Sequence, residues 1–228
     1  MKIYGNIVCQ NVVYDIFRAI DSIIPITDCI YVMDGGSTDG TYEALKSYKN
    51  AYNLKIFQHP FDNLANQRNR LLEEIPKNSW LISPDSDEKF NHQLSMELRG
   101  FLNNLDTGIY TAERTVPLCL AIPWYTLIRD TKHFTRSWSC AVLDRVLYYD
   151  RNMHYVGPYH VRQVYDDNNP TIMMKRGLPG WAIFHYAFLN SDRVKKSKED
   201  IKSGKRDYKK EEWNLKNRDI TELNPILL

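Results

Sequence analysis

The chain has 228 residues, of which 43% are hydrophobic and 25% charged, and its net charge is +2. This apolar content is enough for the core of one α/β domain, and the nearly balanced charge argues against a dedicated nucleic-acid-binding protein. The sequence has no apolar run that approaches the roughly 18 residues of a membrane span.

The first ninety residues alternate between apolar or β-branched runs and stretches with helical periodicity. We predict strands and helices here from their periods, and this β-α-β-α order predicts a doubly wound parallel sheet. A further helix and a strand are predicted to follow. The predicted strands are Ile3–Val8, Cys29–Met33, Leu54–Phe57, Trp80–Ser83 and Gly108–Thr115, and the predicted helices are Val13–Ile23, Thr41–Tyr48, Asn63–Glu74 and Asn91–Leu105.

The second half departs from this alternation. Residues 116–138 are rich in aromatic rings and prolines, short strands are predicted at Cys140–Leu143 and Val146–Tyr149, and residues 192–217 read as a lysine-rich helix. We expect one domain over residues 1–228. It would comprise a nucleotide-binding half (1–90), an acceptor half (91–190) and a basic C-terminal helix and tail (191–228).

The loop after the second predicted strand, Asp34-Gly-Gly-Ser-Thr-Asp-Gly-Thr41, is the most informative stretch. It follows the carboxyl end of a strand, where open α/β sheets bind ligands. It offers carboxylates, which accept hydrogen bonds from a base N–H or a ribose hydroxyl, and lacks the lysine of a phosphate loop. We therefore expect Asp34 to contact the nucleobase or ribose. Asp39 either supports that contact or caps the helix that starts near Gly40.

Another apolar strand ends in Asp85-Ser-Asp87-Glu88. Two carboxylates one residue apart at a strand tip can share one divalent cation, which takes oxygen ligands and bridges diphosphate oxygens. Isolated acidic pairs are common in turns, but this pair follows a strand and lies downstream of the first acidic loop. We expect Asp85 and Asp87 to hold Mn²⁺ or Mg²⁺.

These two motifs resemble the nucleotide loop and the D-x-D metal motif of family 2 glycosyltransferases, which have the GT-A fold. Asn66-Gln-Arg68-Asn69-Arg70 resembles the helix start that faces the diphosphate in that family. Asp144-Arg145-Val-Leu-Tyr148, His154–His160 and Phe184-His185-Tyr186 resemble segments of its lipopolysaccharide-core branch. The resemblance covers about residues 2–198. It implies a GT-A type α/β fold with a Rossmann-like, mostly parallel central sheet flanked by helices and a mixed second half.

The resemblance also implies a function: metal-dependent transfer of a sugar from a nucleoside diphosphate donor, with UDP expected, to an acceptor hydroxyl with inversion. It assigns the diphosphate to Arg68, with Arg70 as an alternative, beside Asp85, and makes Asp87 the leading metal ligand. His185 either completes the metal shell or contacts the diphosphate, or is a satisfied core histidine.

Inverting transfer needs a carboxylate that takes the proton from the acceptor hydroxyl. The branch commonly has an acid after the histidine that aligns with His160, and this chain has Val161 there. Asp166 and Asp167 follow shortly and are the leading candidates for the base, with Glu113 and Asp144 as alternatives. His160 is expected to line the acceptor pocket.

Two rival interpretations stay open. A sugar-phosphate nucleotidyltransferase would share the α/β half, but the glycine-rich signature with Arg and Lys after the first strand is missing. A non-catalytic nucleotide-sugar-binding module would keep the donor loop, and Val161 favours that alternative.

Partners and location follow from the composition and the basic terminus. We expect a glycan, lipid-linked or protein acceptor and no nucleic acid. The four cysteines lack C-x-x-C spacing, which is typical of reduced thiols in the cytoplasm. The lysine-rich helix is either a solvated surface or a peripheral contact with anionic membrane lipids.

Overall fold

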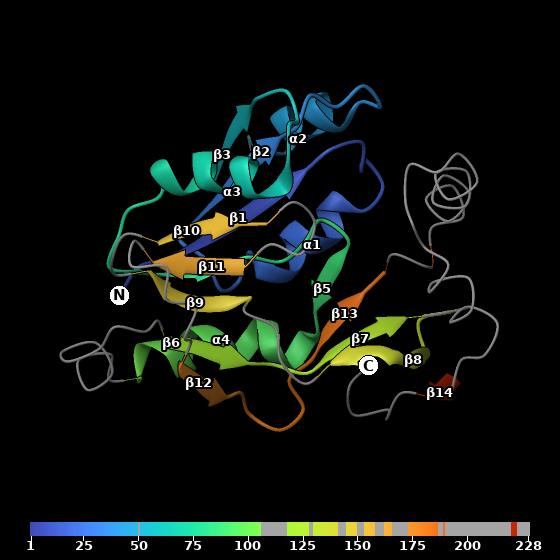
Figure 1. The fold of residues 1–228 in the computed structure, drawn as a ribbon. Helices are drawn as coiled ribbons and strands as arrows, with labels where there is room; N and C mark the ends of the chain where they lie inside the picture. The colour runs from blue at the N-terminus through green and yellow to red at the C-terminus, as the bar shows by residue number, and fades with distance from the viewer. Residues whose placement is uncertain are drawn as a thin grey trace.

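The protein is described by a computed structural model that covers residues 1–49, 51–105, 118–127, 130–140, 145–149, 153–157, 162–165, 173–186, 189 and 220–222. A seven-stranded sheet runs through its centre in the order β12-β6-β9-β4-β1-β2-β3 (Figure 1). Strand β9 is antiparallel to β4 and β6, and the other neighbouring strands are parallel. The predicted α/β fold on a mostly parallel sheet is confirmed. The strands are β1 (Ile3–Cys9), β2 (Cys29–Asp34), β3 (Leu54–Gln58), β4 (Ser79–Ile82), β6 (Leu118–Ala121), β9 (Val146–Tyr149) and β12 (Met173–Arg176).

The helices of the first half lie close to their predicted positions. They are α1 (Ile16–Ile23), α2 (Thr41–Lys49), α3 (Leu64–Glu73) and α4 (His92–Asn103). Helix α1 begins three residues later than predicted: a turn at residues 12–15 precedes it, and the Val13 N–H donates to the Asp39 carboxylate at 3.1 Å. In the part of the chain that the structure describes, no helix is both long and apolar enough to cross a bilayer.

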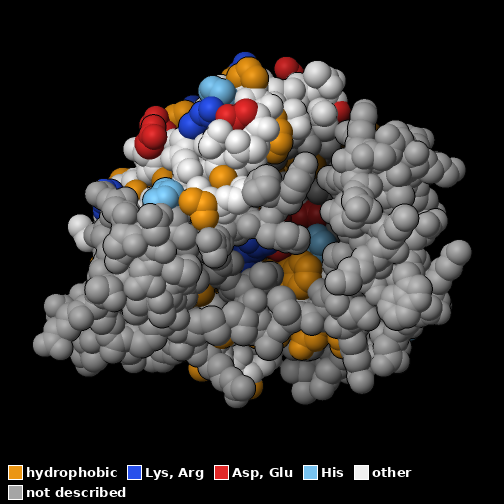
Figure 2. Space-filling model, viewed as in Figure 1, with side chains coloured by type: hydrophobic (Ala, Val, Ile, Leu, Met, Phe, Trp, Pro, Cys, Tyr) orange, Lys and Arg blue, Asp and Glu red, His pale blue; other side chains and the backbone are white. Residues whose placement is uncertain are grey.

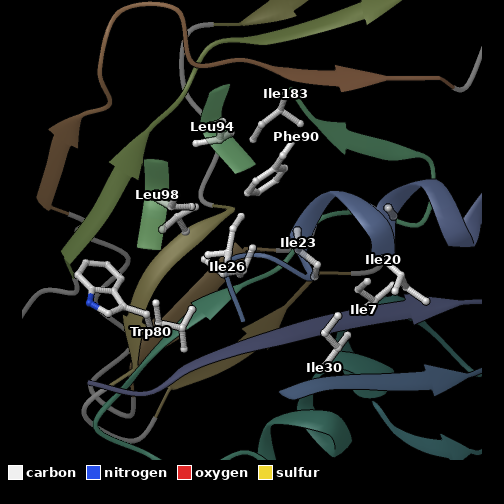
Figure 3. Close-up of a cluster of buried hydrophobic side chains, with 14 of the residues drawn as sticks. Ile7, Ile20, Ile23, Ile26, Ile30, Trp80, Phe90, Leu94, Leu98 and Ile183 are labelled. Atoms are coloured by element: carbon white, nitrogen blue, oxygen red, sulfur yellow. The ribbon is translucent and has the colours of Figure 1, made fainter. Parts of the chain in front are cut away.

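Two hydrophobic clusters cover the two faces of the central sheet. Side chains alternate along a strand, so Ile30 and Val32 pack with α1 and α4, whereas Tyr31 and Met33 pack with α3. Figure 3 shows the larger cluster, in which Ile20 and Ile23 of α1 lie over the sheet. Burial on both faces explains why β2 is apolar along nearly its whole length.

A second, five-stranded sheet has the order β14-β8-β7-β13-β5, and β10 (Met153–Val156) forms an antiparallel pair with β11 (Arg162–Tyr165). Strand β13 pairs with β5 so that His185 lies opposite Glu88. This pairing brings His185 to the acidic motif. The predicted strand at 108–115 and the basic helix at 192–217 lie outside the described residues. The strands of this sheet are β5 (Glu88–Phe90), β7 (Trp124–Leu127), β8 (His133–Cys140), β13 (Ile183–His185) and β14 (Ile220–Glu222).

Candidate functional site

The candidate site lies at one edge of the central sheet, where the parallel strands end. Asp34 is the last residue of β2, and the acidic motif follows β4. Because β9 runs antiparallel to β4, its start lies beside the end of β4, and the Ser83 N–H donates to the Arg145 carbonyl at 2.8 Å. The topology therefore brings Arg145 to the same edge as the predicted donor residues.

The Asp34 carboxylate is fully buried and folds its own loop. One oxygen accepts hydrogen bonds from the Gly36 N–H at 3.0 Å, the Ser37 N–H at 2.9 Å and the Gln58 amide at 3.0 Å. The other accepts from the Ser37 hydroxyl. Gly36 has a φ of +82°, which a glycine adopts readily. Asp34 thus shapes the loop at the strand end, and its contact with a base or ribose stays a prediction.

The Asp39 carboxylate fastens the end of this loop to the start of α2. It accepts hydrogen bonds from the Thr41 N–H at 3.0 Å, the Thr41 hydroxyl at 2.5 Å and the Val13 N–H at 3.1 Å. Burial alone would raise the pKa of Asp39, but these hydrogen bonds outweigh it and lower the pKa. The structure therefore gives Asp39 the helix-start contact, and a ribose contact stays a prediction.

Arg68 and Asp85 form an ion pair that the sequence placed at the diphosphate. Arg68 lies on α3 with a side chain only 3% exposed, and its Nη2 is 2.5 Å from Asp85 Oδ1. Its guanidinium carbon lies 5.5 Å from the ring centre of Tyr155. Arg70, the alternative, pairs instead with Asp62 at 2.8 Å on the exposed side of the helix. The structure thus favours Arg68 over Arg70 as the arginine of the site.

Arg145 is a second arginine at Asp85, and no role was assigned to it from the sequence. It contacts the other Asp85 oxygen, and its Nε and Nη2 donate to the two oxygens of Glu88 at 2.8 and 2.7 Å. Glu88 is completely buried and also accepts from the Asp85 N–H and the Trp124 indole N–H, both at 2.9 Å. The sequence feature that could have identified Arg145 is its place in Asp144-Arg145-Val-Leu-Tyr148, the segment that resembles part of the family.

Asp87 and His185 form the other half of the acidic motif. Asp87 Oδ2 is 3.1 Å from His185 Nε2, and the imidazole stacks on Trp124 with a centroid distance of 4.7 Å. Burial alone would lower the pKa of His185, but the adjacent Asp87 carboxylate outweighs it and raises the pKa. The two residues predicted as metal ligands therefore contact each other directly, and their binding of a metal stays a prediction.

This pair fits two neighbouring ligands of one divalent cation. Two ligands at right angles about 2.1 Å from an ion lie about 3.0 Å apart, close to the separation of Asp87 and His185. Asp85, in contrast, is held by the arginines. Among the described residues, no group of three or more His, Cys, Asp or Glu side chains is arranged to hold a metal.

Figure 2 shows a hollow in one face of the molecule, where acidic, basic and histidine side chains lie deep beside a hydrophobic one. The remaining predicted site residues lie outside the described residues: His160, Asp166 and Asp167, together with the alternatives Glu113 and Asp144. The structure therefore brings together Arg68, Asp85, Asp87 and His185 around Glu88, and places Asp34 and Asp39 in the loop after β2.

A cavity of about 780 Å³ lies beside the five-stranded sheet, between α1, α4 and the residues around β13. Lys89, Lys132 and Arg18 contribute basic side chains to its wall. Tyr186, the residue after His185, also lines it. None of the donor or metal residues predicted from the sequence lines it. The cavity and the charged cluster at Asp85 are therefore separate features.

Comparison with curated proteins finds relatives in Rickettsia. An uncharacterized glycosyltransferase of Rickettsia bellii (strain RML369-C) is 32% identical over 111 residues, which cover 49% of this chain and 36% of the relative. One from Rickettsia prowazekii (strain Madrid E) is 28% identical over 111 residues, with the same coverage. The matched region thus spans only about a third of the length of these relatives.

Comparison with solved structures finds loose similarities. Staphylococcus aureus TarS 1–349 in complex with UDP matches 65% of this chain and 47% of its own length at 18% identity and a TM-score of 0.46. The mannosyltransferase PcManGT from Pyrobaculum calidifontis, in complex with GDP-Man and Mn²⁺, matches 56% of this chain and 36% of its own length at 19% identity and a TM-score of 0.39. Similarities this loose say nothing about substrate or catalytic residues.

The family assignment rests on the sequence profile of glycosyl transferase family 2, which matches residues 7–138. These residues make up more than half of the chain. They include the loop after β2, Arg68 on α3, the acidic motif after β4 and Trp124 on β7. The chain belongs to glycosyl transferase family 2.

Proposed function

We propose that this chain transfers a sugar from a nucleoside-diphosphate sugar, with UDP as the nucleotide, to an acceptor hydroxyl with inversion at the anomeric carbon. The observation that carries the proposal is the convergence of Arg68 and Arg145 on Asp85 at the edge where the parallel strands end. Guanidinium groups match the oxygens of a diphosphate, and this edge is where open α/β sheets bind ligands. Membership of family 2 supports the same reaction class.

The donor would lie across the ends of β2 and β4. The loop that Asp34 shapes and Asp39 fastens would receive the base and ribose, and Arg68 would hold the diphosphate beside Asp85. Because Arg68 is nearly buried and paired with Asp85, the guanidinium is held in place before a donor arrives. An arginine fixed in this way loses little side-chain freedom on binding, which favours affinity.

Asp87 and His185 would hold a divalent cation, Mn²⁺ or Mg²⁺, with Asp85 as a further oxygen ligand. When bound, such an ion neutralises charge on the departing diphosphate. The His185 ring is oriented by its stack on Trp124 and by its contact with Asp87, so Nε2 is presented toward the acidic motif. Donation by the Arg68 guanidinium would stabilise the same developing charge.

The proton of the acceptor hydroxyl would pass to Asp166 or Asp167, and His160 would line the acceptor pocket. This part of the proposal rests on the resemblance to the lipopolysaccharide-core branch and on the order of these residues in the sequence. The acceptor half would be residues 91–190, following a nucleotide-binding half at 1–90. A glycan, lipid-linked or protein acceptor and a cytoplasmic location, peripheral to the membrane through the basic segment, complete the proposal.

Donor binding and transfer can be tested separately. Thermal unfolding should be measured with UDP-, GDP- and dTDP-sugars, each with Mn²⁺, Mg²⁺ or EDTA, because a ligand of the folded state raises stability by about 2.7 kcal/mol at about 100 times its dissociation constant. Stabilisation by one nucleotide sugar that disappears with EDTA is the expected result. Stabilisation by none of them would remove the donor site.

The rival functions predict different products from the same assay mixtures. A non-catalytic module would bind the donor, yet neither hydrolyse it nor transfer its sugar at saturation. A nucleotidyltransferase would release pyrophosphate from a nucleoside triphosphate and a sugar phosphate. The proposed transferase should instead release the nucleoside diphosphate only when an acceptor is supplied or the donor is hydrolysed.

A further inference from the structure

The Asp85 carboxylate lies between two arginines and is the only half-exposed member of this trio. Its side chain is 36% exposed, whereas those of Arg68 and Arg145 are 3% and 15% exposed. Each of its oxygens contacts a different guanidinium. A carboxylate bridging two buried arginines occupies the position that a bridging anion would take.

Arg145 keeps its position without Asp85. Its Nε and Nη2 donate hydrogen bonds to Glu88. The Glu88 carboxylate is held in turn by hydrogen bonds from the Trp124 indole and the Asp85 backbone N–H. Arg68 emerges from α3 beside the Tyr155 ring. The two guanidinium groups can therefore exchange the Asp85 side chain for another anion while their own supports stay in place.

We propose that Arg68 and Arg145 form a diphosphate clamp, and that the Asp85 side chain occupies this clamp as an internal competitor until a donor displaces it. The proposal rests on the proposed donor function and extends it in two ways. First, Arg145 contacts the diphosphate directly. Second, the Asp85 carboxylate competes with the donor for the two arginines and lowers donor affinity when no metal is present. Once displaced, the Asp85 carboxylate is released from the arginines and can serve as an oxygen ligand.

The clamp predicts opposite effects of Asp85→Asn with and without metal. In EDTA the variant removes the competitor, so the affinity for a nucleoside diphosphate should rise roughly fivefold, the size expected for a partly exposed ion pair. With Mn²⁺ the same variant replaces a charged carboxylate ligand by a neutral amide oxygen and should bind more weakly than the unaltered protein. A residue that served only the metal would give no gain in EDTA.

The experiment is isothermal titration calorimetry with UDP, GDP and dTDP, in EDTA and in Mn²⁺, on the unaltered chain and its variants. Asp87→Asn is the matched charge control, because it removes one negative charge from the same motif and its carboxylate contacts His185 at 3.1 Å. Asp62→Asn is the distant control, because it weakens the Arg70 pair on the exposed side of α3. Circular dichroism confirms that each variant is folded.

A gain in EDTA for Asp85→Asn that exceeds the change in both controls supports the clamp. An unchanged or lower affinity in EDTA overturns it, and so does an equal gain for Asp87→Asn, which would attribute the effect to net charge. If the unaltered chain binds none of the three nucleotides under any condition, the proposed donor function fails and the clamp fails with it. Arg145→Lys is the second variant. It keeps the positive charge but loses the two parallel N–H donors of the guanidinium, and an undiminished UDP affinity would overturn the clamp independently.

Discussion

Glu88 offers the most direct test of how the charged cluster is held together, through the substitution Glu88→Gln. Its two oxygens accept four hydrogen bonds, two from Arg145, one from the Trp124 indole and one from the Asp85 N–H. Burial raises the pKa of Glu88, and the Arg145 guanidinium opposes that rise. All four hydrogen-bond partners of Glu88 are N–H donors, so the ionised carboxylate fits them.

Glutamine has nearly the same shape but only one acceptor oxygen, so its NH₂ group must face two of the four donors. Each buried donor that loses its acceptor costs about 1–3 kcal/mol, and breaking a buried ion pair costs about 3–5 kcal/mol. We therefore expect Glu88→Gln to lower the free energy of unfolding by about 3–5 kcal/mol.

Urea unfolding followed by circular dichroism measures this change, provided that the transition is two-state. Asp62→Asn is again the control, since it also removes one carboxylate charge from an arginine pair, but in an exposed position. It should shift the unfolding midpoint much less than Glu88→Gln does, because exposed ion pairs contribute little to stability. If the two variants unfold at the same urea concentration, the cluster is not a buried network and the reasoning above is refuted.

Three further predictions address the loop, the thiols and the metal residues. Gly40→Ala should lower the free energy of unfolding by about 1–2 kcal/mol, because Gly40 has a φ of +90°. Gly100→Ala should raise it by about 0.5–1 kcal/mol, because Gly100 lies exposed within α4 and an added Cβ would meet no atom. Equal shifts of the two variants in a urea titration would contradict both expectations. Burial, aided by the neighbouring Asp34 carboxylate, raises the pKa of the Cys9 thiol, so peptide mapping should find Cys9 alkylated by iodoacetamide only after unfolding. Asp87→Ala should abolish transfer while the circular dichroism spectrum stays unchanged, and full turnover by that variant would remove the metal assignment.

The first half of the fold could be predicted because its inner strands, β1, β2 and β4, are buried on both faces. A strand such as Cys29–Asp34 is then apolar along nearly its whole length, and the acids that follow β2 and β4 mark where these two strands end. The start of α1 could not be predicted in the same way. Val13 has a helical pattern, but it lies in a turn over residues 12–15 and contacts Asp39, a partner 26 residues away that no local period reveals.

The candidate site was predicted in part for a related reason. The acids of the site lie at or just after strand ends, namely Asp34 at β2 and Asp85 and Asp87 after β4. Their common place at one edge of the sheet could therefore be inferred from the β-α-β order alone. Arg145 reaches the same edge only because β9 inserts antiparallel beside β4, and His185 only because β13 pairs with β5. Both pairings join segments more than 60 residues apart, and the period of a single strand carries no information about its neighbour.

The balance of charge in the cluster gives a physical reason for a donor and a cation to bind together. Among its described residues, the positive charges of Arg68 and Arg145 face the carboxylates of Asp85, Asp87 and Glu88, so the negative charges are in excess unless His185 is protonated. A diphosphate adds further negative charge to a largely buried site, where repulsion is screened less than at the surface. The carboxylates of the acidic motif therefore repel a diphosphate that binds alone. A divalent cation held by the same carboxylates would make the local charge positive, so that the diphosphate is attracted.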